Sequence, residues 1–166
     1  MKRIFYFMII ALLLSGCTQS LSQSERVSLE NYESYYKITL NEREPKRSSD
    51  YFSIEGMLSP IEGGLFRYDI FIDSPQIAMR DVTVMIIEND IAFEDQSQMM
   101  PSIGIFDSRV NLYPNQVDTS LNYYKGINLN REIEEDSVTL RVLVEFTNAT
   151  RDESYHEIIE MKLSNP

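Results

Sequence analysis

From Tyr51 to the C-terminus, apolar and polar residues alternate with a period of two, which is the pattern of a half-buried β-strand. The clearest run is SVTLRVLVEF (137–146), in which every second side chain is apolar. Six further runs share the pattern: YFSIEGML (51–58), LFRYDIFIDS (65–74), IAMRDVTVMII (77–87), SIGIF (102–106), LNYYKGINL (121–129) and YHEIIEMKL (155–163). Turn signals such as Gly63-Gly64 and Ser74-Pro75 separate most of them. We therefore expect about seven strands in residues 51–166.

Sheets of this kind bury one face against a second layer, which favours a sandwich or barrel over a single open sheet. The number, length and spacing of the strands are those of an immunoglobulin-like domain. No helical pattern of comparable strength is evident, apart from a short turn near residues 91–97. The expected fold is all-β: an immunoglobulin-like two-sheet antiparallel β-sandwich.

Two neighbouring strands add a resemblance to this pattern. The run YDIFID (68–73), a Ser-Pro turn and RDVTV (80–84) resemble the second and third strands of bacterial surface immunoglobulin-like modules. The chain departs from antibody domains, because it has no tryptophan and a single cysteine. The resemblance covers about twenty residues. It implies a fold and no particular ligand.

The first seventeen residues, MKRIFYFMIIALLLSGC, predict the location of the protein. Lys2 and Arg3 precede eleven apolar residues (4–14), as in a secretory signal peptide. The segment Leu14-Ser15-Gly16-Cys17 resembles the lipobox of bacterial lipoproteins, and Cys17 is the only cysteine in the chain. This resemblance implies transfer of diacylglycerol to the Cys17 thiol, cleavage before Cys17 and acylation of the new amino terminus.

Two other interpretations of this segment stay open. A transmembrane helix needs about 20 apolar residues, and the present run is shorter. A plain secretory signal would need no cysteine at the cleavage point. Lipidation predicts a bacterial lipoprotein held by acyl chains and facing outside the cytoplasm. In a cell with two membranes we expect the outer one, because Thr18 is not the aspartate associated with inner-membrane retention.

Between the signal and the strands, the sequence predicts little regular structure. Residues 17–31 are polar and indicate a flexible tether between a signal peptide (1–16) and the domain. Residues 32–50 are ambiguous: YYKITL could form a further strand, and NEREPKRSSD indicates a loop. The basic residues of that loop, Arg43, Lys46 and Arg47, are either solvated or in contact with lipid headgroups or an acidic partner.

The charge of the chain limits its partners. The formal net charge is −11 at pH 7, and removal of residues 1–16, which contain two basic and no acidic residues, makes it −13. Nucleic acid would be repelled by such a surface, and so would anionic lipid. With Cys17 acylated, no thiol is left for a disulfide.

Catalytic and cofactor motifs are absent from the sequence. The chain contains no GxSxG, HExxH, CxxC, Walker A or GxGxxG motif. The single histidine, His156, is expected to face solvent on the last strand. One histidine and one cysteine cannot form a usual zinc site. We therefore expect no enzymatic activity, no catalytic residues and no cofactor.

Calcium is the one metal that the sequence leaves to consider, because carboxylates are abundant. Glu88, Asp90, Glu94 and Asp95 occupy one predicted loop, and Glu132, Glu134, Glu135 and Asp136 occupy another. If both loops lay at one end of the sandwich, their oxygens could converge on an ion. Neither loop has the spacing of an EF-hand, and a solvated acidic surface is the simpler interpretation.

Tyrosines form two dense groups, Tyr32, Tyr35, Tyr36 and Tyr51 in one and Tyr123 and Tyr124 in the other. Tyrosine is common both in strands and at interfaces, so either packing or binding could explain them. The resulting hypothesis is an anchored, non-catalytic module that binds a protein or polymer partner in the cell envelope. Two alternatives stay open: an accessory or scaffold subunit of an envelope assembly, and a lipoprotein that binds calcium or a small molecule weakly.

Overall fold

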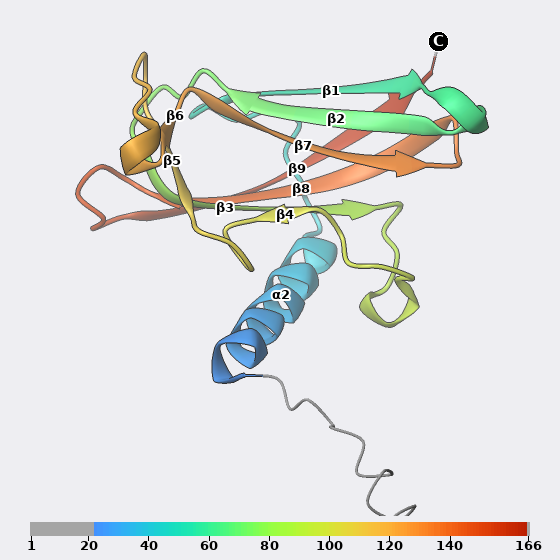
Figure 1. The fold of residues 1–166 in the computed structure, drawn as a ribbon, viewed down its shortest axis with the longest axis horizontal. Helices are drawn as coiled ribbons and strands as arrows, with labels where there is room; N and C mark the ends of the chain where they lie inside the picture. The colour runs from blue at the N-terminus through green and yellow to red at the C-terminus, as the bar shows by residue number, and fades with distance from the viewer. Residues whose placement is uncertain (1–21, 166) are drawn as a thin grey trace, which may run out of the picture.

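The computed structural model describes residues 22–165, in which two β-sheets face each other and one long helix lies outside them (Figure 1). Nine strands make up the sheets: β1 (Ser53–Pro60), β2 (Phe66–Asp73), β3 (Met79–Glu88), β4 (Ser102–Ile103), β5 (Val110–Leu112), β6 (Tyr123–Tyr124), β7 (Gly126–Ile133), β8 (Ser137–Thr147) and β9 (Ser154–Ser164). The helix is α2 (Gln23–Asn41). Three short 3-10 turns connect strands: η1 (Glu62–Gly64), η2 (Phe93–Asp95) and η3 (Thr119–Leu121).

The smaller sheet has three antiparallel strands in the order β1-β2-β7. The larger sheet has six strands, in the order β6-β5-β3-β8-β9, with β4 paired to β3. All its pairs are antiparallel except β5 with β6. Strands β8 and β9 pair along their whole length, from Ser137 opposite Ser164 to Thr147 opposite Ser154. The expectation of a mainly β, two-layered domain is confirmed.

The main core lies between the two sheets. Alternate side chains of each strand point into it, as the period of two predicts. Tyr68, Ile70 and Ile72 of β2 are inaccessible to solvent, and so are their counterparts on the larger sheet. The counterparts are Val82, Val84 and Ile86 of β3, and Leu140, Val142 and Val144 of β8. Apolar burial between the layers is therefore the main force that holds the sheets together.

Helix α2 corrects the interpretation of residues 17–50. The described part of the expected tether (22–31) and the possible strand YYKITL are helical. The helix begins with a capping box, in which Ser22 accepts a hydrogen bond from the Glu25 backbone and the Glu25 side chain accepts one from the Ser22 backbone. The fold is thus not all-β.

The helix covers the outer face of the larger sheet, where it forms a second, smaller core. Tyr32 and Tyr36, four residues apart on one side of the helix, are buried there. The strand residues beneath the helix include Met85, Leu143 and Ile158. These strand residues are apolar on the face opposite the main core. Both faces of the larger sheet are therefore buried at its centre.

The strand predictions need two smaller corrections. LNYYKGINL contains two strands, because β6 ends at Tyr124 and β7 begins at Gly126. A further short strand, β5, was not expected. The turn expected at Gly63-Gly64 is confirmed, since both glycines have positive φ values, 82° and 78°.

Cys17 and the predicted signal peptide lie outside the described residues. Among the helices that the structure describes, none is both long and apolar enough to span a bilayer.

Candidate functional site

The most unusual local geometry lies at the start of β3. The register of β3 shifts between Arg80 and Thr83 against β8, and between Met79 and Val82 against β5. Within this irregular stretch, Asp81 has a φ of 54°, which is uncommon for a residue with a side chain. Its backbone N–H donates a 3.0 Å hydrogen bond to the Asn111 side chain. Irregularities of this kind redirect side chains at the edge of a sheet.

Arg80 lies against two tyrosines from neighbouring strands and loops. Its guanidinium carbon is 5.3 Å from the ring centroid of Tyr113 and 5.9 Å from that of Tyr123. The two rings stack on each other with their centroids 4.4 Å apart. These distances are within the range of cation–π attraction. We call Arg80, Tyr113 and Tyr123 the Arg80 cluster.

The guanidinium of Arg80 is not neutralised by the described chain. Its Nε atom is shielded from solvent and has no hydrogen-bond partner within residues 22–165. The ion pairs that lysine and arginine side chains form in the same residues do not include Arg80. An arginine held flat against aromatic rings keeps its planar set of donors available for a carboxylate or phosphate.

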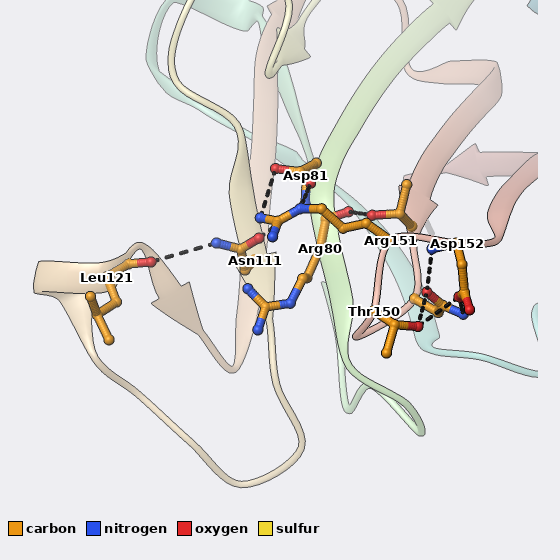
Figure 2. A network of polar contacts seen from close by, with 9 residues as sticks. Arg80, Asp81, Asn111, Leu121, Thr150, Arg151 and Asp152 are labelled. Atoms are coloured by element: carbon orange, nitrogen blue, oxygen red, sulfur yellow. Dashed lines mark hydrogen bonds and ion pairs between the residues drawn. The ribbon is translucent and has the colours of Figure 1, made fainter.

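Asp81, beside Arg80, points instead toward the turn between β8 and β9 (Figure 2). There its carboxylate forms an ion pair with Arg151, with Oδ2 and Nε 2.5 Å apart. The hydrogen bond from Arg151 lowers the pKa of the Asp81 carboxyl. The ion pair occupies the acid next to Arg80, so Asp81 is directed away from the Arg80 cluster.

The turn that carries Arg151 is held by its own polar side chains. Thr150 donates a 2.6 Å hydrogen bond to Asp152, and the Asp152 backbone N–H donates to the Asn148 side chain at 3.2 Å (Figure 2). Asn148-Ala149-Thr150, a sequon by its letters, therefore lies in a turn.

A polar hollow of about 410 Å³ adjoins the Arg80 cluster through Tyr113. Its wall combines the turn after β2 with residues that follow β5, and Lys125 adds a cation. The residues that line it are Asp73, Ser74, Pro75, Gln76, Tyr113, Pro114, Asn115 and Lys125. Together, the Arg80 cluster and the hollow form an aromatic and cationic surface on an acidic protein.

The carboxylates considered for calcium have other partners. Glu88 accepts a 2.7 Å hydrogen bond from the Tyr68 hydroxyl and lies 3.5 Å from the Arg131 guanidinium. Asp90 pairs with Arg141 at 2.6 Å, and Glu94 and Asp95 are exposed on η2. Residues 22–165 contain no group of three histidine, cysteine or acidic side chains placed to hold a metal ion. The geometry gives the calcium interpretation no support.

His156 lies on the surface of β9, as expected. Its Nδ1 atom is 3.6 Å from the Glu145 carboxylate, which also accepts a 2.8 Å hydrogen bond from Tyr35. The imidazole lowers the pKa of Glu145. The rest of the His156 face differs from the expectation, because Ile158 on the same face is buried beneath α2.

The tyrosine groups separate into two roles. Tyr32 and Tyr36 are buried between α2 and the larger sheet, so packing explains them. Tyr123 belongs to the Arg80 cluster. The sequence analysis named Tyr123 but not Arg80 or Tyr113, and the only signal for Arg80 was an arginine at the start of a predicted strand. Its contact with rings that follow β5 depends on tertiary structure.

Comparison with known proteins identifies no family. No family model and no curated protein matches the chain. Two solved structures are similar at low level. One is structural genomics target SoR45, with a TM-score of 0.44 and 15% identity over 71% of this chain and 89% of that chain. The other is a Bordetella pertussis protein provisionally described as ApaA, with a TM-score of 0.41 and 13% identity over 74% of this chain and 98% of that chain.

Proposed function

We propose that the chain is a lipid-anchored, extracytoplasmic module with an immunoglobulin-like sandwich that binds an anionic partner in the cell envelope. In this proposal Cys17 carries the lipid, and the domain has no catalytic role. The partner is a protein or polymer that presents carboxylate or phosphate groups. The observation that carries the binding proposal is the unpaired Arg80 guanidinium, held between Tyr113 and Tyr123 at 5.3 and 5.9 Å.

Physical chemistry supports this surface as the binding region. Arginine and tyrosine are the residues that most often dominate the energy of protein interfaces. The stacking of Arg80 fixes its orientation before binding, which reduces the entropy that a partner must overcome. The buried Nε of Arg80 lacks an acceptor in the described chain, and a bound anion would provide one.

The anchor is tested in cells by changing the sulfur alone. Cys17→Ser removes the thiol that the lipobox resemblance assigns to diacylglycerol, and we expect the protein to leave the membrane fraction and to lose labelling by a fatty-acid analogue. A variant that stays in the membrane fraction would contradict the lipid anchor.

The binding surface is tested by photo-crosslinking in intact envelopes. A photoreactive residue at Asn115, in the wall of the polar hollow, should yield a defined crosslinked product. The same residue at Met57, which is exposed on β1, is the matched control and should yield no such product. Arg80→Gln should remove the Asn115 product while the protein remains folded. A product that forms equally from both positions, or that survives Arg80→Gln, would contradict the proposal.

A further inference from the structure

Helix α2 is covered along only part of its length. Its buried residues, Tyr32, Tyr36 and Thr39, all lie in the second half of the helix. The first half extends away from the larger sheet, on the side opposite β1, β2 and β7 (Figure 1). The start of the helix therefore has no layer of the domain beneath it.

Apolar side chains nevertheless gather at this projecting end. Val27 and Leu29 of the helix are 49% and 38% exposed, and Phe106, from the loop after β4, is 49% exposed. Leu29 and Phe106 line a shallow hollow of about 330 Å³ together with Ser24, Glu25 and Ser28. The Phe106 ring lies 5.6 Å from the ring of buried Tyr32, measured between centroids, so it is attached to the helix core. We call Val27, Leu29 and Phe106 the α2 tip.

The position of the α2 tip in the chain indicates what it meets. Ser22 caps the helix, and Cys17 precedes it by five residues, which span at most about 18 Å when fully extended. A lipid on Cys17 would thus keep the α2 tip close to the bilayer at all times. So short a connection gives the membrane a high effective concentration at this surface, which a partner in solution does not have.

We propose that the α2 tip rests on the surface of the anchoring membrane, with Leu29 and Phe106 inserted at the boundary between headgroups and acyl chains. This inference rests on the lipid anchor proposed above. Leucine and phenylalanine are the side chains that interfacial helices insert into this region. The first turns of the helix carry Glu25, Arg26 and Glu30, a mixed set of charges that suits zwitterionic headgroups. The sheet of β1, β2 and β7 then faces away from the membrane.

The absence of tryptophan from the chain allows a direct test. Phe106→Trp and Leu29→Trp each place a single fluorophore at the α2 tip. Phe71→Trp is the matched control, because Phe71 is 41% exposed on β2, in the opposite layer. The chain from Cys17 onward is coupled through its only thiol to a maleimide lipid in phosphatidylcholine vesicles. This coupling attaches the protein whether or not cells lipidate it.

Phosphatidylcholine brominated near the headgroup end of its acyl chains serves as the quencher. We expect it to remove roughly half of the Phe106→Trp emission, since interfacial segments sit about 5–10 Å into the boundary, and to leave the Phe71→Trp emission unchanged. Equal quenching at both positions, or none at Phe106, would overturn the inference.

Two further outcomes have clear meanings. Emission from Phe106→Trp that is already shielded from an aqueous quencher without vesicles, and more so at higher protein concentration, would assign the α2 tip to a second copy of the chain and overturn the inference. The Cys17→Ser fractionation in cells tests the anchor separately. Quenching in the coupled vesicles therefore decides the membrane contact even if that fractionation contradicts lipidation.

Discussion

The hydroxyl of Tyr68 donates a 2.7 Å hydrogen bond to the carboxylate of Glu88 and thereby joins the two sheets at one end of the sandwich. Tyr68 belongs to β2 and is inaccessible to solvent, whereas Glu88 ends β3. The Arg131 guanidinium of β7 lies 3.5 Å from the same carboxylate. Burial and the nearby Glu88 charge raise the pKa of Tyr68, so the phenol stays protonated as a donor.

Removal of this hydroxyl should weaken the domain. We expect Tyr68→Phe to lower the free energy of unfolding by about 1.5–3 kcal/mol, because a hydrogen bond to a charged, mostly buried group is lost. Urea denaturation measures the change. Tyr155→Phe is the control, since the Tyr155 hydroxyl contacts the exposed Glu153 side chain, and it should unfold close to wild type. Equal effects of the two variants would contradict the role given to Tyr68.

The close approach of Gly104 to β3 gives a second prediction. Gly104 has a φ of 78°, and an added Cβ would lie 2.6 Å from the Val82 carbonyl oxygen. Gly104→Ala should cost more than about 2 kcal/mol, since left-handed strain and backbone overlap add. Gly63→Ala shares the positive φ but has nothing within 4 Å, so it should show the strain alone. Thermal unfolding that gives the two variants equal losses would contradict the overlap.

The position of α2 can be tested from the strand beneath it. Ile158 is 4% exposed, and we expect Ile158→Ala to cost about 2–5 kcal/mol through the cavity left under the helix. Lys162→Ala, on the same face of β9 but exposed, should change the free energy of unfolding by less than about 0.5 kcal/mol. If Ile158→Ala also had so small an effect in urea denaturation, the helix would not cover this face.

The ion pair of Asp81 with Arg151 predicts a dependence on pH. Because Arg151 lowers the pKa of Asp81, the pair contributes stability above the ordinary aspartate pKa of about 3.9, and this contribution is lost as the pH falls through the lowered value. Arg151→Gln should therefore raise the pKa of Asp81 toward the ordinary value. Carbon-13 NMR titration of the carboxyl measures it, with Lys162→Gln as the control. An unchanged pKa in Arg151→Gln would show that the pair does not form in solution.

Local patterns were sufficient for the sheets. Alternation along β2, β3, β8 and β9 identified the side chains of the main core, because successive side chains of a strand point to opposite faces whatever the strand pairs with. The same alternation did not show that Ile158 and Leu143 are covered on the other face. Their environment depends on a helix that is distant from them in sequence.

The helix had local signals that were outweighed by its polar composition. The capping box at Ser22 and Glu25 and the spacing of Tyr32 and Tyr36 are both helical features. A helix with so few apolar residues gains much of its stability from packing on a sheet, and the sequence alone does not reveal that packing.

The sequence by itself thus determined the strands, the main core and the predicted lipid attachment at Cys17, since each follows from neighbouring residues. Only the tertiary structure decided the Arg80 cluster, the partners of Glu88 and Asp90, and the exposed α2 tip. Each of these brings together side chains from separate elements. The physical reason is that side-chain direction within a strand is a local property, whereas burial and pairing between elements depend on how the whole chain packs.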